Sequence, residues 1–318
     1  MPDDADRLVQ WLLAGVTWKT TVFHVGQYCG RWHASTAGRS LASFHAVLRG
    51  RCWLHRPGRP AVALEEGEAV FLLRDLPHHL SPDANPAAPA LPTPLQPTWP
   101  ARAGGTALAC GFVGFEGPLT AWLLGALDDP LLLRRGQPEG DLHQAARVFD
   151  LMREEADRCT CPLGQPDEDT PSALLERLAG LLFHYVLRHA VRHDGAAAAR
   201  AGLWCLARHP QLAPLLSRLL EQPSQDWTAQ RMAESVHRSR ARFFREFTSA
   251  CGEPPAQFLQ RLRMQLAAQR LHRGDSVARA AQFVGYQSDA AFTRAFRQVL
   301  GVLPGAWQRT SPAAAAPH

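Results

Sequence analysis

One segment near the C-terminus, residues 275–307, constrains this chain more than any other because it has the pattern of two short helices joined by a tight bend. Apolar residues recur at helical spacing from Val277 to Val284, which predicts the first helix. Gly285 interrupts that pattern, since glycine adopts positive φ at low cost, and Ser288 is placed to cap the second helix. A short helix that follows a glycine bend and carries arginine on its outer face fits a major groove. The alternative is a packing hairpin with solvated arginines.

A similar unit lies upstream, at residues 227–247, and it argues against the packing alternative. Its bend falls at His237, and Ser239 is placed to cap its second helix. The two units are joined by residues 254–274, which begin with two prolines, continue with leucines at helical spacing and end with a glycine. Two such units on one rigid helix can enter successive major grooves on the same side of a duplex.

The whole stretch from Trp227 to Trp307 resembles the DNA-binding domain of AraC/XylS-type transcription regulators, including GYQSDAAFTRAF and the closing GVLPGAW. The resemblance implies helix-turn-helix units at 228–247 and 277–298. It places DNA-binding residues at Ser239, Arg240, Ala241, Phe244 and Arg245 in the first unit and at Ser288, Asp289, Ala290, Thr293, Arg294 and Arg297 in the second. Arginine can pair bidentately with guanine, and an aspartate can accept from a cytosine amine.

Two residues depart from the family pattern. The glycine that is usual at the first bend is His237 here, and histidine is among the residues that tolerate positive φ, so we expect strain and not collapse. Phe244 stands where the family often has a polar residue, and it cannot hydrogen-bond to a base. The first unit is therefore expected to depend more on thymine methyl groups, DNA shape and phosphate than on base edges.

Charge is concentrated at the C-terminal end of the chain. Residues 221–318 hold 13 arginines and seven carboxylates, a net charge of +6, whereas residues 1–220 hold 21 basic and 22 acidic residues, a net charge of −1. The positive charge thus lies on the part expected to bind phosphate. The chain has no run of 18 apolar residues and begins with an acidic segment unlike a signal peptide, which predicts a cytoplasmic protein with no membrane partner.

The N-terminal half has short alternating segments separated by glycine and proline, which predicts an antiparallel β-barrel or jelly roll. A further strand pair is expected at 107–115, after a proline-rich loop at 82–104. The pattern becomes helical from Leu119 onward. The segments YCGRWHAS, SFHAVLRGRCWL and GEAVFLLRDLPHHL resemble the cupin-type sensor domain of one branch of the same regulators.

The fold class expected is therefore α+β with two domains: a cupin-like barrel with a helical dimerisation segment, and an all-α double helix-turn-helix domain. We place the first domain at 8–190, a linker at 191–210, the DNA-binding domain at 211–309 and a disordered tail at 310–318. A leucine-rich stripe from Leu174 to Tyr185 either packs on the barrel or forms a dimer face.

Cupin enzymes hold a metal with two motifs, and only part of the second is present here. Gly67 and His78 have the right spacing, but no H-x-H precedes Gly50, and Ser43 stands where the first motif has a glutamate. A three-ligand catalytic site cannot be assembled from the matched positions. Histidines that could still converge on a ligand or a metal are His45, His55, His78 and His79, with His45 and His78 the candidate ligand contacts; the alternative is a structural role. No cofactor is expected.

Seven cysteines in a chain of this kind do not indicate a disulfide framework. Some members of the cupin-bearing branch respond to oxidants such as reactive chlorine through cysteines, and Cys29 and Cys110 fall where such relatives place them. A sensing thiol must be accessible and partly ionised. The alternative is that both are small buried apolar residues. A C-x-C pair, Cys159 and Cys161, lies in a polar segment.

These observations predict a DNA-binding transcription regulator, an activator more than a repressor, that responds through its barrel to a small molecule or an oxidant. The resemblance implies promoter DNA, RNA polymerase and a second copy of the chain as partners. The alternative is a metal-dependent cupin enzyme with an accessory DNA-binding domain, which the missing first motif disfavours.

Overall fold

The structure is a computed structural model, and it describes residues 17–39, 41–88, 96, 98, 101–116, 120, 124, 127, 129–135, 140–159, 173–193 and 202–309. The chain divides into two compact units. One contains the β-sheets and two long helices, and the other contains the C-terminal helices. None of the described helices is long and apolar enough to cross a membrane.

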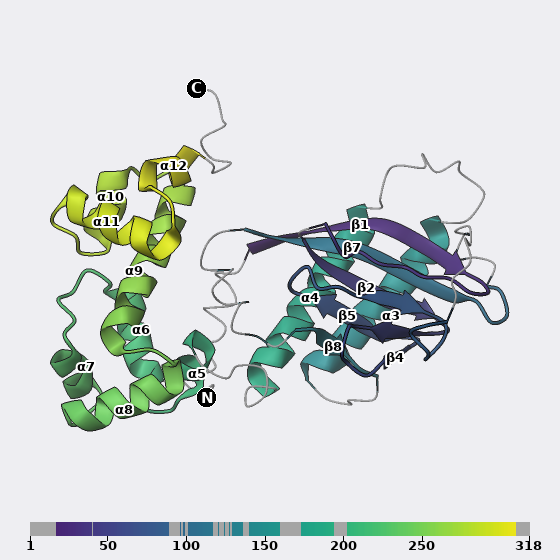
Figure 1. Cartoon of the computed structure of the whole chain (residues 1–318), viewed down its shortest axis with the longest axis horizontal. Coiled ribbons are helices and arrows are strands. Elements are labelled where there is room, and N and C mark those ends of the chain that lie inside the picture. Colours follow the sequence, from purple (N-terminus) through teal and green to yellow (C-terminus); the bar gives the residue numbers. More distant parts are fainter. Residues whose placement is uncertain are drawn as a thin grey trace. The chain divides into compact units, whose positions relative to one another are not determined.

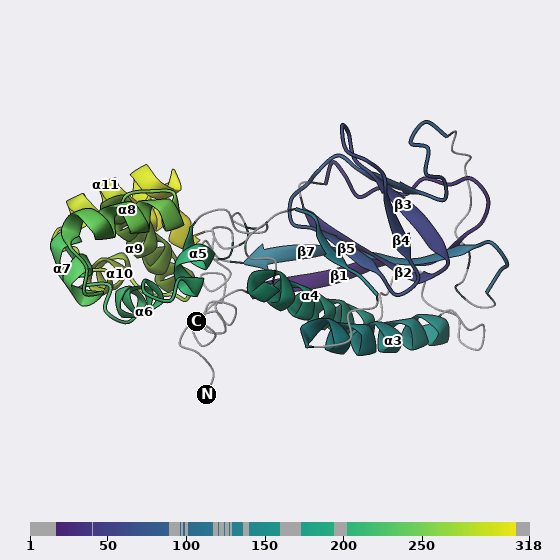
Figure 2. The same ribbon diagram turned by 90° about the horizontal axis from the view of Figure 1, so that it is seen from below.

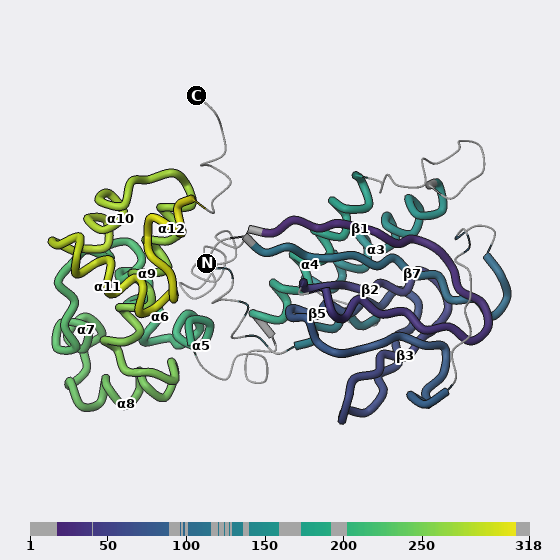
Figure 3. The backbone as a smooth tube through the Cα atoms, turned by 45° about the horizontal axis from the view of Figure 1, so that its top comes forward, coloured from purple at the N-terminus to yellow at the C-terminus, as the bar shows by residue number. Residues whose placement is uncertain are grey.

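The first unit is built on a five-stranded sheet in which each described pairing is antiparallel. Its strands in spatial order are β1 (Thr17–Tyr28), β7 (Thr106–Glu116), β2 (Ala42–Arg49), β5 (Ala69–Leu72) and β8 (Leu131–Leu133). Figure 3 shows β1, β7, β2 and β5 side by side. Seven of the eight residues of β2 are buried, because this central strand is covered on both faces.

A smaller sheet packs on one face of the first. It contains β4 (Val62–Glu65), β3 (Arg51–His55) and β6 (His79–Ser81), in that order. Side chains from both sheets fill the space between them, including Val47 and Leu108 from the large sheet and Cys52 and Leu54 from the small one. The predicted β-rich cupin-like domain is therefore confirmed, although the described strands form two separate sheets and do not close into one barrel.

The opposite face of the large sheet is covered by α3 (Asp141–Cys159) and α4 (Ala173–His193), which Figure 2 shows lying side by side beneath it. Phe183 on α4 contacts Trp18 on β1 and Phe71 on β5, with ring centroids 5.2 and 5.3 Å apart. The Arg49–Asp157 ion pair also joins β2 to α3. These contacts make the two helices part of the same unit as the sheets.

Two expectations about this unit were wrong in detail. The segment 107–115 forms one long strand, β7, and not a strand pair. Its Gly111 allows close packing, since a Cβ there would lie 2.2 Å from the Thr21 carbonyl oxygen and 2.3 Å from the Phe44 ring. Helical structure was expected from Leu119 onward, but Leu131–Leu133 pair with β5 as β8. A run of three leucines has no periodicity that separates a strand from a helix.

The second unit is entirely helical. Its helices are α5 (Leu203–Arg208), α6 (Ala213–Glu221), α7 (Ala229–Ser235), α8 (Arg240–Cys251), α9 (Pro255–His272), α10 (Val277–Phe283), α11 (Asp289–Leu300) and α12 (Pro304–Arg309). The predicted all-α C-terminal domain is thus confirmed. Helix α5 falls inside the segment expected to be a linker, because Leu203, Trp204, Leu206 and Ala207 are buried and α5 packs against α8.

Helix α9 is the centre of this unit. It contacts α8 towards one end and α10, α11 and α12 towards the other, and Figure 1 shows it between the two groups. Ten of its 18 residues are buried, so it has no single apolar face. At a rise of about 1.5 Å per residue it is a rod roughly 27 Å long. The predicted tail, residues 310–318, lies outside the described residues.

Candidate nucleic-acid interface and sensor site

The first helix-turn-helix consists of α7 and α8, and its ends are fixed by local hydrogen bonds. The Thr228 side chain accepts from the backbone N–H of Arg231 at the start of α7, and the Ser239 side chain accepts from that of Arg242 at the start of α8. The bend between the helices has His237 at φ 54°, the only positive φ among the described non-glycine residues. Phe243 and Phe247 are fully buried beneath α8 and fix its inner face.

The second unit, α10 and α11, repeats this construction. Ser276 caps α10 by accepting from the Arg279 N–H, and Ser288 caps α11 by accepting from the Ala291 N–H. The bend residue is Gly285, at φ 83°, where a Cβ would also lie 2.7 Å from the Ser224 carbonyl oxygen. Phe292 and Phe296 are fully buried beneath α11. Helices α8 and α11 lie on the same face of the helical unit, one towards each end of α9 (Figures 1 and 2).

The arginines of this unit fall into two groups. One group is used internally: Arg242 pairs with Glu246 at 2.6 Å, Arg270 pairs with Asp275, and Arg263 donates to the Pro223 carbonyl at 2.8 Å. The other group is exposed and has no ion pair or hydrogen-bonding partner for its side chain among the described residues. Its members on α8 and α11 are Arg240, Arg245, Arg294 and Arg297. A guanidinium with no internal partner is free to bind phosphate or a guanine edge.

The residues predicted to contact DNA thus lie where such contacts are possible. Ser239, Arg240, Ala241, Phe244 and Arg245 are exposed at the start and outer face of α8, and Ser288, Asp289, Ala290, Arg294 and Arg297 are exposed on α11, with Thr293 half-buried. Phe244 is 45% exposed, so its ring is accessible on the outer face of α8. Their individual contacts with DNA remain predictions.

The sensor half contains a buried polar network between its two sheets. His45 on β2 lies with Nδ1 3.0 Å from the Cys110 Sγ on β7 and with Nε2 3.0 Å from the His78 Nε2. Thr36 Oγ1 lies 3.1 Å from the His78 Nε2 and donates to Ser43 Oγ at 2.7 Å. The sequence indicated His45, His78 and Cys110 separately but not Thr36, which has no motif of its own.

The Leu76 carbonyl determines which atom donates and which accepts in each hydrogen bond of this network. His78 Nδ1 lies 2.7 Å from the Leu76 carbonyl oxygen, which can only accept, so Nδ1 carries the proton. In neutral His78, Nε2 is then an acceptor, and His45 must donate to it from Nε2. His45 Nδ1 is left as an acceptor, and the Cys110 thiol donates to it. Burial lowers the pKa of His45 to about 3, with smaller contributions from His78 and His24, so the imidazole is neutral at pH 7.

This geometry does not form a metal site. The His45 ring stands between the other two donors, with Cys110 at one nitrogen and His78 at the other, so the three cannot point to a single ion. Among the described residues, no group of three His, Cys, Asp or Glu side chains is placed to hold a metal.

The other two candidate histidines form a separate cluster. His79 stacks on His55 and contacts His33 with the rings tilted, and the ring centroids are 4.6 Å apart in each case. His55 Nε2 donates to the Asp83 carbonyl at 2.9 Å, which fixes its orientation. Burial lowers the pKa of His79, and the neighbouring His55, His33 and His78 lower it further. Of the four histidines considered together, the structure therefore joins His45 with His78 and His55 with His79.

The two candidate sensor cysteines have different environments. Cys110 is buried, and burial raises its pKa, so it is a protonated thiol. Cys29 is half-buried, and its Sγ would lie 3.2 Å from a Cβ at Gly105. Gly105 is five residues from Cys110 along a strand that rises about 3.3 Å per residue, so the two sulfur atoms are too far apart for a disulfide in this structure. The side chain of Cys159 and the whole of Cys161 lie outside the described residues.

Two helix-turn-helix units with unpaired outward arginines, carried on the same chain as a cupin-like β domain, define a DNA-binding regulator with its own sensor domain. Comparison with known proteins agrees. Residues 7–192 match the family described as Cupin, and residues 232–310 match the family described as Helix-turn-helix domain.

Full-length relatives carry both parts. The chain is 27% identical over 299 residues to an uncharacterized HTH-type transcriptional regulator of Haemophilus influenzae, covering 89% of this chain and 92% of that protein. It is 24% identical over 270 residues to the RCS-specific HTH-type transcriptional activator RclR of Escherichia coli (strain K12), covering 85% and 84%. Among solved structures, the DNA-binding domain of AdpA in complex with a target DNA is 30% identical, covers 33% of this chain and 96% of that chain, and has a TM-score of 0.31.

The chain belongs to the AraC/XylS family of transcription regulators, in the branch with an N-terminal cupin domain. It is a sequence-specific DNA-binding protein, and double-stranded DNA is its partner.

Proposed function

We propose that the chain is a one-component transcriptional activator that acts in the cytoplasm and is not an enzyme. In this proposal α8 and α11 enter successive major grooves of a promoter. The base-facing residues are Ala241, Phe244 and Arg245 on the first helix and Asp289, Ala290, Thr293 and Arg294 on the second. The observation that carries the proposal is the set of exposed arginines without internal partners on these two helices.

The test for DNA binding is a gel shift with the full chain on fragments of its own upstream region. We expect specific binding that weakens steeply as salt rises, because each phosphate contact releases counterions. Binding that is absent or insensitive to salt on every fragment would contradict the proposal.

We propose that the active form is a homodimer joined through α4. Leu175 and Leu182 are buried, whereas Leu174 and Leu181 are 47% and 43% exposed. These two outward leucines are one heptad apart, the spacing at which a helix presents a seam to a second helix. We expect Leu174→Lys with Leu181→Lys to convert a dimer to a monomer by light scattering, whereas the matched pair Glu154→Lys with Arg158→Glu on the exposed face of α3 leaves the mass unchanged.

We propose that the dimer contacts RNA polymerase and that its input is an oxidant or a small molecule. An oxidant as input is supported by the resemblance to the cupin-bearing branch, some members of which respond to oxidants. The E. coli relative, whose name describes it as RCS-specific, also supports it. Cys29 is the more accessible of the two candidate thiols, so it is expected to react first.

A promoter–reporter assay with hypochlorite separates the two inputs. A thiol switch predicts that Cys29→Ser loses the response and that Cys110→Ser weakens it, while the control Cys205→Ser in the helical unit responds as wild type. A response that survives both sensor substitutions would exclude the thiol switch and leave the ligand.

The enzyme alternative receives no support from the interior of the domain. The His45 ring stands between Cys110 and His78, so these three side chains cannot bind one metal ion, and there is no place for a metal-bound water. The relatives reported above are named as regulators.

A further inference from the structure

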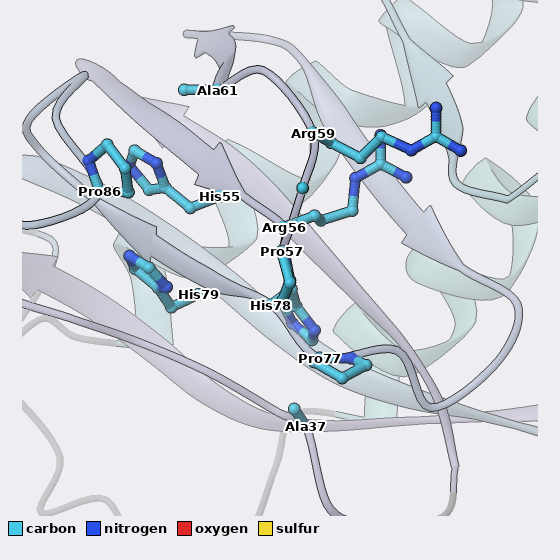
Figure 4. Close-up of a pocket in the computed structure, with 11 residues that line it drawn as sticks. Ala37, His55, Arg56, Pro57, Arg59, Ala61, Pro77, His78, His79 and Pro86 are labelled. Carbon is cyan, nitrogen blue, oxygen red and sulfur yellow. The ribbon is translucent and has the colours of Figure 1, made fainter.

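A pocket of about 500 Å³ opens beside the small sheet (Figure 4). It is formed by the end of β3, the turn that follows it and the start of β6. Its lining combines three histidines and two arginines with alanine and proline side chains, and no carboxylate is among the described residues that line it. The volume is in the range of small-molecule sites in proteins.

Two nitrogen atoms in this lining have no partner. The Arg56 Nε and the His79 Nε2 are buried atoms without a hydrogen bond among the described residues. Arg56 is held in place at its other end, where Nη1 donates to the Asp129 carbonyl at 3.3 Å. Buried polar atoms are nearly always hydrogen-bonded. The Arg56 Nε always carries a proton and the His79 Nε2 carries one in one tautomer, so a ligand that supplies acceptors would satisfy both nitrogens.

The donors lie in two groups separated by apolar surface. Figure 4 shows Arg56 and Arg59 extending on one side of the pocket, His55 and His79 on the other, and Pro57 between them. Guanidinium groups bind carboxylates through charge-assisted hydrogen bonds, and an imidazole becomes a stronger donor when an anion favours its protonated form. Alanine and proline suit an aliphatic chain between two such ends.

We propose that this pocket binds a short aliphatic dicarboxylate, with one carboxylate on Arg56 and the other on His79. The assignment rests on the proposed role of the N-terminal domain as a sensor, and it names the class of its small-molecule input. His78 connects the two sites, because it lines the pocket and also accepts the hydrogen bond from His45.

Isothermal titration calorimetry of the full chain tests the proposal on the wild-type protein. The probes are glutarate, its uncharged analogue glutaramide, butyrate with a single carboxylate, and inorganic phosphate. We expect glutarate to bind at least tenfold more tightly than each of the other three, because it alone carries two anionic ends on an apolar spacer.

Two substitutions test the donors separately. Arg56→Gln removes the guanidinium, and His79→Phe keeps an aromatic ring against His33 and His55 but removes the donor nitrogen. Each should weaken glutarate binding by about tenfold, the usual effect of losing one charge-assisted hydrogen bond. The controls Arg102→Gln and His143→Phe change exposed residues of the same unit outside the pocket and should leave the affinity unchanged.

The pH dependence of glutarate binding distinguishes a direct contact between His79 and the ligand from a purely structural role of His79. The pKa of His79 is depressed in the empty pocket by burial and by His55, His33 and His78, and a bound carboxylate would raise it. Glutarate binding should therefore take up a proton and strengthen as the pH falls from 8 towards 5.5. The His79→Phe variant should show a weaker dependence.

Equal binding of glutaramide or phosphate, or no binding of glutarate at millimolar concentration, would overturn the dicarboxylate assignment even if the protein occupies its promoter. Glutarate binding that is unchanged by both Arg56→Gln and His79→Phe would overturn the placement in this pocket. A protein that binds glutarate as expected but occupies no promoter would instead contradict the proposed function, so the two failures are distinguishable.

Discussion

The two helix-turn-helix units share a frame but differ in what they present to DNA. Both begin with a hydroxyl cap, both bury two phenylalanines beneath the second helix, and both end at a left-handed glycine, Gly252 and Gly301. The outer face of α8 carries Phe244 with two unpaired arginines, whereas that of α11 carries Asp289, Thr293 and two unpaired arginines. The frame therefore requires particular residues inside and leaves the outside free to vary.

The bends show the same contrast at the level of the backbone. In the second unit Gly285 is required twice, by its positive φ and by the proximity of the Ser224 carbonyl. In the first unit His237 adopts a positive φ of 54° with its side chain exposed. Glycine is thus needed where backbone crowds the position, and elsewhere a residue that tolerates φ > 0 is sufficient.

The largest expected effect tests what the units have in common. Reversing charge at both helices, Arg245→Glu with Arg294→Glu, should reduce promoter affinity by about 100-fold or more, since two base or phosphate contacts become repulsive. Fluorescence anisotropy with a labelled promoter fragment measures the loss, and circular dichroism checks the fold. The control Arg208→Glu with Arg309→Glu changes the net charge equally on other helices and should cost only a few-fold. Equal losses in the two double variants would mean that only the overall charge matters.

The next prediction tests what distinguishes the units. Arg294→Ala should cost about 1–3 kcal/mol of binding free energy and relax the preference for particular base pairs, whereas Phe244→Ala should cost under about 1 kcal/mol. Anisotropy on the promoter fragment and on variants with single base-pair changes measures both effects. A larger loss of discrimination from Phe244→Ala than from Arg294→Ala would reverse the roles assigned to the two helices.

The bends should respond in opposite directions. Gly285→Ala should destabilise the protein by about 1–3 kcal/mol, because the new Cβ is strained by φ and crowded by Ser224. His237→Gly should relieve strain and raise stability by up to about 1 kcal/mol. Thermal unfolding followed by circular dichroism compares each variant with wild type. Similar destabilisation by both substitutions would show that the two bends are equivalent after all.

The smallest effect concerns the caps. Ser239→Ala and Ser288→Ala each remove one acceptor for a backbone N–H and should each cost about 1 kcal/mol of stability. The two losses should agree closely because the cap geometry is the same, and the measurement is again the midpoint of thermal unfolding. A marked inequality would indicate that one cap residue also makes a contact with the rest of the domain.

The helical unit was predictable from the sequence because its signals are local. A cap, a bend and two phenylalanines four residues apart all fall within 20 residues, so periodicity and turn chemistry identify them directly. The resemblance then added positions that periodicity alone does not assign. What the sequence missed here was α5, whose burial depends on packing against a helix about 40 residues away.

The sensor site could be predicted only in part. His78 and Cys110 lie 33 and 65 residues from His45 along the chain, and only the pairing of β2 with β7 brings His45 and Cys110 together. The split of the four histidines into two clusters depends on how β2, β3 and β6 are placed in the two sheets, which the spacing of the residues does not reveal. Arg56 and Arg59 stand in a turn, where arginine is ordinarily solvated, and nothing in their spacing indicated a pocket.

The row of hydrogen bonds from Cys110 to Leu76 has a consequence for the chemistry of the thiol. Each imidazole in the row accepts at one nitrogen and donates at the other, so neither can change tautomer alone. If oxidation takes the proton from the sulfur, His45 Nδ1 loses its donor. The two rings cannot both reverse to replace it, because His78 Nδ1 would then face the Leu76 carbonyl with no proton between two acceptors. Loss of the thiol proton would therefore leave a buried nitrogen without a partner, and this cost favours the reduced thiol as long as the interior stays closed.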